Sequence, residues 1–598
     1  MIRIEDKIAA QVQLAIEKLF AQKVEREKIT LQPTRKDFDG DFTLVVFPFV
    51  KLARRSPEQT AQAIGEELQN AMEEIESFNV IKGFLNFTLG NKYWLNFLGE
   101  AAAEKDFGTR KPDETDIVVV EYSSPNTNKP LHLGHIRNNL LGYSVAQILE
   151  AAGRKTMKVN LVNDRGIHIC KSMLAWMKWG DGETPESTGK KGDKLVGDYY
   201  VKFETELRRE AQALKESHQL DDDNARNNAP LMQEARELLR KWEARDPETV
   251  EIWKTMNGWV YKGFDSTYQR LGVNFDKIYY ESDTYLLGKE IVLEGLEKTA
   301  FYKKEDGSVW ADLTDEGLDE KLLLRADGTS VYITQDIGTA QLRYDDYQAN
   351  QMVYVVGNEQ NYHFDVLKKV MKKLGKPYAD SLMHLSYGMV ELPQGKMKSR
   401  EGTVVDADEL MEEMYATAKE TTEKLGKTGG LEKDKKEKLF DVIGLGALKY
   451  FILKVDPKKN MLFNPEESID FNGNTGPFIQ YTHARIRSIM RKAEERELVN
   501  KEYNAGKVSL NEKEKNLLRS LYAFPQVVQD AAAEMSPAHI ANYVYDLAKE
   551  FNQFYHDHSV LNEPDQDVSL FRLQLSELTA RVLKTATGML GIDVPERM

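Results

Sequence analysis

The chain has 598 residues, of which 41% are hydrophobic and 30% are charged, a balance that is ordinary for globular proteins. It is too long for one hydrophobic core, so we expect roughly three to five domains. The single cysteine, Cys170, excludes internal disulfides and any zinc site built from several thiolates. The formal net charge of −15 opposes RNA binding in general, so an RNA partner would need a local basic surface.

The sequence contains no signal for a membrane or an export pathway. No apolar run approaches the length of about 20 residues that a membrane span requires. The opening MIRIEDKIAA carries acidic residues in its first turns, which is not typical of a signal or transit peptide. We therefore expect a cytoplasmic protein.

Residues 1–112 predict a small α+β domain. An amphipathic helix opens the chain, with Ile8 and Val12 on its apolar face. Two strand-like stretches, residues 42–49 and 80–87, flank a helical stretch over residues 57–75. The polar KPDETD that follows is typical of a linker.

Residues 113–405 have the rhythm of a doubly wound, Rossmann-like α/β domain. The β-branched IVVVEY of residues 117–122 is typical of a strand buried on both faces in a parallel sheet. A helix over residues 131–152, closed by Gly153, and a strand over residues 157–162 complete a β-α-β unit. The alternation resumes with a strand, a helix and a strand over residues 352–356, 361–374 and 385–392.

The remaining segments are predicted to be helical. The polar stretch over residues 180–255 interrupts the α/β pattern and predicts a helical insertion. After Asp406 strand signals are absent. We divide this part into a helical junction over residues 406–470 and an all-α C-terminal domain over residues 471–598.

The first chemical motif is HLGH, from His132 to His135, at a predicted strand-to-helix turn. A helix N-terminus offers unpaired N–H groups and a partial positive charge, so phosphates bind there. The same charge disfavours imidazolium, so we expect both histidines to be neutral N–H donors. Gly134 has no Cβ and would let an adenine or ribose approach the backbone. Taken alone, two histidines at a helix start are more often capping or core groups.

The second motif is GKMKSR, residues 395–400, which follows the last predicted strand. Ligands bind at the carboxyl ends of parallel strands, so this loop can reach the same crevice as HLGH. Its three cations suit the pyrophosphate that leaves when an α-phosphate is attacked. Taken alone, it also looks like any solvated basic turn.

Together and in this order, the two motifs resemble the HIGH and KMSKS elements of class I aminoacyl-tRNA synthetases. The resemblance implies catalytic roles for His132, His135 and Lys396. It implies ATP binding by Gly134, Lys398 and Ser399. The third KMSKS position is usually serine and is Lys398 here. In the arginine branch of the family, a lysine just before HIGH takes over the second charge, and Lys129 occupies that place, so both lysines are candidates for it.

The stretch EYSSPNTNKPLHLGH, residues 121–135, resembles the arginine-specific form of the first motif. Two further stretches, residues 326–340 and 355–363, resemble the same branch. A guanidinium is planar and always charged, so it requires a carboxylate and favours an aromatic face. The resemblance implies an arginine pocket formed by Glu121, Ser124, Asn126, Tyr332, Asp336 and Gln360. Asp164, beyond another strand, is left outside this set.

The two ends of the chain resemble tRNA-binding domains of the arginyl enzymes. Residues 471–487 are similar to the start of the anticodon-binding domain, and the first 110 residues to the domain that contacts the tRNA elbow. We expect Tyr481, Arg485 and Arg487 to contact unstacked bases of the tRNA. Arginines on helix flanks are otherwise usually solvated surface.

The resemblance therefore implies an arginine–tRNA ligase. It would form arginyl-adenylate and pyrophosphate from arginine and ATP, and then esterify the 3′-terminal adenosine of tRNA(Arg). We expect a monomer that uses Mg²⁺ with the nucleotide and no zinc. Another class I synthetase and an HxGH nucleotidylyltransferase are the alternatives, although the latter has no need of a helical C-terminal third. A vestigial RNA-binding relative is disfavoured by the intact HLGH, Lys396 and Asp336.

Overall fold

The computed structural model describes residues 3–35, 37–391, 405–426, 432–499 and 501–598. The chain forms two compact units. The first combines Met1–Phe107 with Arg485–Pro525 and Leu547–Val582, and the second combines Gly108–Ala484, Gln526–Asp546 and Leu583–Met598. The helices of the predicted C-terminal domain therefore contribute residues to both units.

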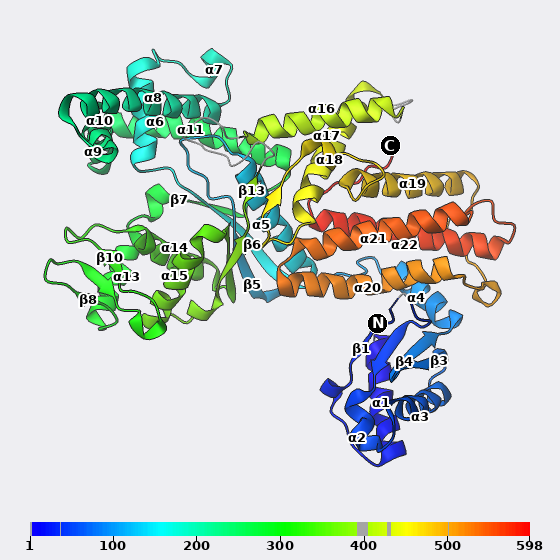
Figure 1. Ribbon diagram of the computed structural model, residues 1–598. Coiled ribbons are helices and arrows are strands. Elements are labelled where there is room, and N and C mark those ends of the chain that lie inside the picture. Colours follow the sequence, from blue (N-terminus) through cyan, green and yellow to red (C-terminus); the bar gives the residue numbers. More distant parts are fainter. Residues whose placement is uncertain (1–2, 36, 392–404, 427–431, 500) are drawn as a thin grey trace. The chain divides into compact units, whose positions relative to one another are not determined.

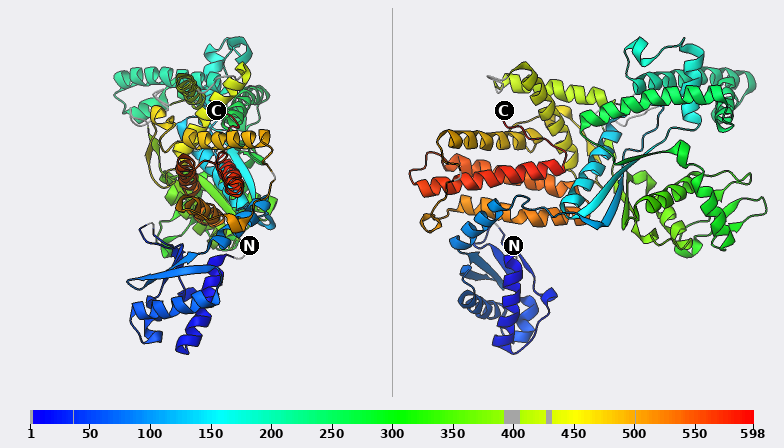
Figure 2. Two further views of the ribbon diagram at one scale, coloured as in Figure 1. Left: turned by 90° about the vertical axis from the view of Figure 1, so that its right-hand side faces the viewer. Right: turned by 180° about the vertical axis from the view of Figure 1, so that it is seen from behind.

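The N-terminal part of the first unit is an antiparallel sheet in the order β1-β2-β4-β3, with helices on one face. Figure 2 shows α1 and α3 side by side on that face. Gly65 of α3 lies so close to Phe78 of β3 that a Cβ would be 2.5 Å from the ring. The elements are α1 (Ile4–Phe20), η1 (Arg26–Lys28), β1 (Leu31–Pro33), β2 (Phe42–Val45), η2 (Phe47–Phe49), α2 (Val50–Ala53), α3 (Pro57–Ala71), β3 (Ile75–Ile81), β4 (Phe84–Leu89) and α4 (Asn91–Ala103).

The strand boundaries in this domain differ from the prediction. The single strand expected over residues 80–87 is a hairpin between β3 and β4. Lys82 and Gly83 form its turn with φ of 50° and 80°, and glycine adopts such angles without steric cost. The strand expected over residues 42–49 ends at Val45, and a 3₁₀ helix that contains Pro48 follows it.

Tyr522 attaches this sheet to α20 (Glu512–Glu534) within the first unit. Its buried ring lies 6.0 Å from that of Phe42 in β2, centroid to centroid, in an edge-on arrangement. Arg519 of the same helix forms an ion pair with the buried carboxylate of Asp41. An aromatic cluster and a charged pair therefore hold the sheet against the helix.

The core of the second unit is a five-stranded parallel sheet in the order β12-β11-β5-β6-β7, at the centre of the ribbon in Figure 1. The chain runs outward from β5 through β6 to β7 and then returns to the other side of β5 through β11 and β12. Such a reversal places a ligand crevice at the carboxyl ends of the central strands. The strands are β5 (Asp113–Glu121), β6 (Arg154–Val162), β7 (Lys277–Tyr280), β11 (Gln351–Gly357) and β12 (Leu382–Tyr387).

Helices cover both faces of this sheet, which confirms the predicted doubly wound α/β class. Val119 and Val159 pack into a buried cluster with residues of α14 (Tyr332–Tyr347) and α15 (Asn361–Lys373). Val118 and Val120 alternate with Val119, are fully buried, and therefore face the opposite side. There α5 (Leu133–Ala151) packs so closely that a Cβ on Gly142 would lie 2.3 Å from Tyr122.

Several short strands of this unit were not predicted from the sequence. The strand expected over residues 385–392 is β12, which ends at Tyr387, followed by β13. The latter pairs in parallel with β14, so a strand does occur after Asp406. An additional antiparallel sheet has the order β10-β9-β8. These strands are β8 (Tyr302–Lys303), β9 (Val309–Ala311), β10 (Lys321–Leu324), β13 (Val390–Glu391) and β14 (Met461–Leu462).

The insertion is helical, as predicted, and it extends past residue 255. Its last helix, α11, continues without a break to Leu271, where Gly272 with φ 71° ends it. Asp246 caps the start of this helix by accepting a hydrogen bond from the Thr249 N–H (3.0 Å). The helices of this region are α6 (Ile167–Trp179), α7 (Pro185–Thr188), α8 (Gly192–His218), α9 (Asp222–Asn228), α10 (Pro230–Glu243) and α11 (Pro247–Leu271).

The remaining described elements are helices, consistent with the predicted helical C-terminal part. No helix among the described residues combines the length and apolar character needed to cross a membrane. The elements are α12 (Glu281–Thr284), α13 (Leu287–Glu297), η3 (Thr314–Glu316), η4 (Asn358–Gln360), η5 (Ala379–Ser381), α16 (Ala407–Lys424), α17 (Lys433–Leu453), α18 (Pro465–Ser468), α19 (Gly476–Glu495), η7 (Ala505–Lys507), α21 (Pro537–Asp557) and α22 (Gln566–Met589).

Candidate active site

The HLGH motif lies beyond the carboxyl end of β5, at the start of α5. His132 is the N-cap residue of this helix, and its Nδ1 accepts a hydrogen bond from the Gly134 N–H (3.1 Å). In return, Nδ1 of His135 accepts a hydrogen bond from the His132 N–H (3.2 Å). Both bonds satisfy N–H donors at the helix start that would otherwise be unpaired. Because both Nδ1 atoms are acceptors, the proton of each neutral ring is on Nε2.

Both imidazoles are neutral at pH 7. Burial lowers the pKa of His132 to about 3, and the charge of Lys129 adds to this effect. Burial also holds the pKa of His135 well below its usual value, with smaller contributions from His132 and Lys129. The ring centroids are 4.0 Å apart. The motif therefore presents two neighbouring Nε2–H donors, in agreement with the protonation state that the helix start predicts.

Gly134 is required by the histidine beside it. A Cβ at this position would lie 2.9 Å from Cε1 and 3.1 Å from Nδ1 of His132. Such a contact would displace the ring from its capping position. The sequence predicts room for an adenine or a ribose here, whereas the closest side chain in the structure is His132 itself.

The second motif lies outside the described residues, so Lys396, Lys398 and Ser399 keep the status of predictions. Lys129, the alternative source of the second positive charge for the phosphates, lies among the described residues and is half-buried. Burial lowers the pKa of its ammonium group. An anionic ligand beside it would oppose this effect and favour the charged form.

The chain that follows the second motif lies directly beside the first. The Leu133 N–H donates to the Val405 carbonyl (3.1 Å), and the Ala407 N–H donates to the Leu131 carbonyl (2.9 Å). These two bonds enclose His132 in a short antiparallel bridge with Asp406. The backbone on both sides of His132 is therefore fixed by the segment that begins α16.

Glu121, expected in the arginine pocket, has a guanidinium partner within the chain. It is the last residue of β5, and its carboxylate forms an ion pair with Arg343 of α14. Both side chains are almost fully buried. The Arg343 guanidinium also lies 5.4 Å from the ring centroid of Tyr279 and 5.3 Å from that of Tyr354. Glu121 is thus committed to an internal charge pair.

Ser124 lies in a tightly held loop after β5. Its hydroxyl donates to Oε1 of Glu121 (2.8 Å), and its N–H donates to Oδ1 of Asn160 (2.9 Å). Ser123 and Ser124 have φ of 77° and 45°, which are uncommon for residues with a side chain. Such strain persists only where the surroundings fix the backbone, as at binding sites. Asn126, in the same loop, is exposed.

Asp336 pairs with a histidine and stays partly open to solvent. Its Oδ2 lies 2.6 Å from Nε2 of His363, and this bond raises the pKa of the imidazole. The carboxylate side chain is 36% exposed, and no described residue forms a hydrogen bond with its Oδ1. Tyr332, one turn earlier on α14, is 80% exposed, and Gln360 is also exposed. These three side chains are open to a ligand.

Tyr354 connects the two predicted carboxylates. It lies in β11, in register with Glu121 of β5. Burial raises the pKa of its hydroxyl to about 12, and the charges of Arg343, Glu121 and Asp336 all act on it. The ends of β5 and β11 and the first turns of α14 therefore converge. They meet at the sheet edge where the strand order predicts a ligand crevice.

Comparisons with known proteins identify this arrangement. Residues 99–464 match the family model "tRNA synthetases class I (R), catalytic domain". Residues 6–89 match the arginyl tRNA synthetase N terminal domain, and residues 479–598 match the DALR anticodon binding domain. The chain is 59% identical over 598 residues to the arginine–tRNA ligase of Bacteroides fragilis (strain YCH46), with all of both chains covered.

The chain belongs to the class I arginyl-tRNA synthetases. It is also 55% identical over 597 residues to the arginine–tRNA ligase of Porphyromonas gingivalis (strain W83), covering 100% of this chain and 99% of that one. The solved structure of Thermus thermophilus arginyl-tRNA synthetase matches with a TM-score of 0.79 at 26% identity, covering 100% of both chains. That from Plasmodium falciparum shares the fold, with a TM-score of 0.74 at 21% identity over 100% of this chain and 99% of that chain. Family membership confirms the predicted fold and enzyme class, and it rules out a nucleotidylyltransferase.

Two charged residues near this edge of the synthetase's sheet were not identified from the sequence. Arg343 lies two turns after Asp336 on α14, and nothing in the local sequence indicates its pairing with Glu121. Glu281 follows β7, a strand of only four residues that was not recognised. Burial raises the pKa of Glu281 to about 7, Arg165 opposes this effect, and the charges of Asp164 and Asp336 add to it. The run of one β-branched and two aromatic residues at 278–280 was the available signal.

Asp164, left outside the predicted set, has a structural role in this synthetase. Its carboxylate accepts hydrogen bonds from the N–H (2.9 Å) and hydroxyl (2.8 Å) of Ser282 and from the Tyr261 hydroxyl (2.8 Å). Its backbone carbonyl accepts from Trp253 (2.7 Å) of α11. Burial raises the pKa of this carboxyl group. Asp164 therefore connects the end of β6 to α11 and to the start of α12.

On α19, Arg485 lines a cavity of about 170 Å³ together with other cations and an aromatic ring. Its guanidinium lies 5.5 Å from the ring centroid of Tyr555. Lys492 and Arg496 also line the cavity. The apolar side chains of Ile486, Ile489 and Met490 on the same helix are buried. Tyr481 and Arg487, which were also expected to contact the tRNA, are half-buried.

Proposed function

We propose that this chain activates arginine with ATP to give arginyl-adenylate and pyrophosphate. It then transfers the arginyl group to the 2′-hydroxyl of the terminal adenosine of tRNA(Arg). The observation that carries the proposal is that one sheet edge bears both a pair of neutral, Nε2-protonated histidines, after β5, and an available carboxylate, Asp336, beside β11. The full-length identity to arginine–tRNA ligases supports the same reaction.

In the ATP half of the site, the start of α5 would bind the phosphates. The Nε2–H groups of His132 and His135 donate to phosphate oxygens as charge develops on the leaving pyrophosphate. Because both imidazoles are neutral, their ability to donate does not depend on a protonation of the rings near pH 7. Lys129 supplies a positive charge close to both rings. Lys396 would act on the leaving group, and Gly134, Lys398 and Ser399 would contact the nucleotide.

Mg²⁺ would enter this site as part of the nucleotide substrate. Among the described residues, no three histidine, cysteine or acidic side chains form a group that could hold a metal ion. The chain thus offers no ready-made metal site among those residues. The ion neutralises phosphate charge when it is bound to ATP.

In the arginine half of the site, Asp336 would bind the substrate guanidinium. Oδ2 of Asp336 accepts from His363, so Oδ1 is the oxygen available to a second donor. Tyr332 would cover the guanidinium with its ring, and Gln360 and Asn126 would contact the polar end of the amino acid. Glu121 would not bind the substrate with its own carboxylate, because that carboxylate is paired with Arg343. It would contribute to the pocket by holding Arg343 and Ser124 in place.

For tRNA, we propose that the cavity beside Arg485 accepts an unstacked base of the anticodon loop. We propose that Tyr481 and Arg487, on the same helix, also contact the tRNA. A basic cavity with an aromatic wall suits a stacked base and the adjoining phosphate. The N-terminal domain would contact the tRNA elbow. We propose that the enzyme acts as a monomer in the cytoplasm.

The test is ATP–pyrophosphate exchange, measured for each amino acid with and without tRNA. Arginine alone should support exchange when tRNA is present. Exchange with another amino acid in place of arginine would overturn the substrate assignment. Exchange with arginine that is unchanged in His132→Ala would overturn the assignment of the ATP site.

A further inference from the structure

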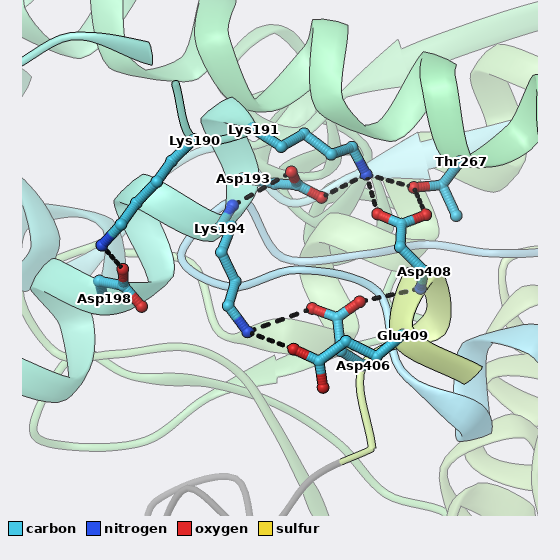
Figure 3. Close-up of polar contacts among 9 residues, drawn as sticks. All are labelled: Lys190, Lys191, Asp193, Lys194, Asp198, Thr267, Asp406, Asp408 and Glu409. Carbon is cyan, nitrogen blue, oxygen red and sulfur yellow. Dashed lines mark hydrogen bonds and ion pairs between the residues drawn. The ribbon is translucent and has the colours of Figure 1, made fainter. Parts of the chain in front are cut away.

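The insertion and the start of α16 are joined by charged side chains near the first motif. Figure 3 shows lysines from the beginning of α8 pointing toward carboxylates at the beginning of α16. Nζ of Lys191 lies 2.5 Å from Oδ2 of Asp408 and 3.2 Å from Oδ2 of Asp193. It also lies 2.5 Å from the hydroxyl oxygen of Thr267 in α11. One ammonium group thus contacts three elements.

A second lysine repeats this connection one turn further along α8. Nζ of Lys194 lies 3.7 Å from Oδ2 of Asp406 and 3.1 Å from Oε1 of Glu409. Asp406 also caps α16, since its Oδ1 accepts from the Asp408 N–H (2.8 Å). The first turn of α16 is therefore held by two lysines of the insertion.

The contacts of Lys191 are sheltered enough to matter energetically, whereas the pair of Lys194 with Glu409 is exposed and adds less. The side chain of Asp193 is 1% exposed and that of Lys191 is 27% exposed. Exposed ion pairs contribute little, whereas removing one partner of a buried group leaves an uncompensated charge. Without Lys191, the carboxylates of Asp193 and Asp408 would face each other unneutralised. Their repulsion would act to separate α8 from α16.

The first turn of α16 is in turn bonded to the HLGH segment. The residues on either side of Asp406 make the two backbone hydrogen bonds that enclose His132, at 3.1 and 2.9 Å. A displacement of Asp406 would therefore move the backbone on both sides of His132. Small displacements of groups that bind the reacting phosphates reduce rates strongly.

We propose that Lys191 and Lys194 are positioning residues for the ATP site. They fix the start of α16 and, through its bridge to residues 131–133, the direction of the His132 Nε2–H donor. Neither lysine needs to touch the substrate. The inference rests on the proposed role of His132 at the ATP site, and it assigns to the insertion a role in activating the amino acid.

The test compares Lys191→Met with Lys190→Met. Lys190 is the adjacent residue, precedes α8 and forms an ion pair of 2.6 Å with Asp198 of that helix, and the structure records no contact between it and the described residues of α16. In ATP–pyrophosphate exchange with tRNA and arginine saturating, Lys191→Met should lower kcat/KM for ATP about tenfold. The KM for arginine should stay within about twofold of wild type. Lys190→Met should behave as wild type, and Lys191→Arg should recover most of the loss.

A double variant separates positioning from loss of folding. Lys191→Met together with Asp408→Asn removes one of the two unneutralised charges, and with it their repulsion, so it should recover part of the ATP efficiency. Thermal unfolding of each variant, with and without ATP, reports whether the fold is retained. Equal effects of the Lys191 and Lys190 substitutions would overturn the inference, as would equal losses toward arginine and ATP. If His132→Ala slows exchange while Lys191→Met does not, only this inference fails, and if His132→Ala has no effect, the proposed ATP site fails.

Discussion

The two carboxylates that we predicted for the arginine pocket should respond to substitution in opposite ways. Asp336 is 36% exposed and has an oxygen available to a ligand, whereas Glu121 is buried against Arg343. Asp336→Asn keeps the shape of the side chain and removes its charge. We expect this change to weaken arginine binding and to leave the fold intact.

The magnitude follows from the geometry. A hydrogen bond to a charged group contributes about 1.5–3 kcal/mol, and partial exposure places Asp336 in the lower half of this range. A loss of about 2 kcal/mol corresponds to a rise in the KM for arginine of roughly 30-fold. The KM for ATP should change by less than about threefold, because the proposed phosphate site is at the start of α5 rather than on α14.

Glu121→Gln should instead destabilise the protein. It leaves the buried Arg343 guanidinium without a negative partner, which costs about 3–5 kcal/mol. Exchange kinetics with varied arginine or ATP, together with thermal unfolding, distinguish the two outcomes. The reasoning is refuted if Asp336→Asn raises both KM values equally, or if Glu121→Gln unfolds at the wild-type temperature and raises only the KM for arginine.

Three further outcomes are expected. Lys396→Ala should slow activation by roughly 10²–10³-fold with an unchanged unfolding temperature, and a near-wild-type exchange rate would remove its role. Gly134→Ala places a methyl group 2.9 Å from the His132 ring and should lower kcat by at least about tenfold, whereas wild-type exchange would show that the ring tolerates displacement. The pKa of Glu281 is raised to about 7, so its ionisation opposes folding as the pH rises from about 4.5 to 7. Glu281→Gln should then be more stable than wild type by up to about 3 kcal/mol at pH 8 and equal to it at pH 4 in urea unfolding, and a constant difference would contradict the shift.

The parts of the fold that were predicted correctly have strong local signals. The run IVVVEY gave β5, and Gly153, with φ 104°, ends the helix that follows it. The missed strands β7 to β10 have only two to four residues each and are strands because of their pairing partners. The turn at Lys82 and Gly83 was overlooked because the strands on both sides are apolar.

The site was predicted from the sequence only in part, for a similar reason. The cap formed by His132 and His135 depends only on residues close in the sequence and on the start of α5. The neutral state of both imidazoles could therefore be predicted from their position. The pairing of Glu121 with Arg343 depends on the packing of α14 beside β5, which no local pattern specifies. Family resemblance assigned Glu121 to the pocket, whereas only the structure distinguishes its internal pair from the open carboxylate of Asp336.

The central claim is that tRNA is charged with arginine at the histidine pair. The most direct measurement is the transfer of labelled arginine to tRNA by the purified chain with ATP, compared with a variant that lacks both rings, His132→Ala/His135→Ala. We predict arginyl-tRNA formation by the wild type and a rate at least about 10²–10³-fold lower for the variant. Charging with a different amino acid, or an unchanged rate without the two imidazoles, would contradict the account.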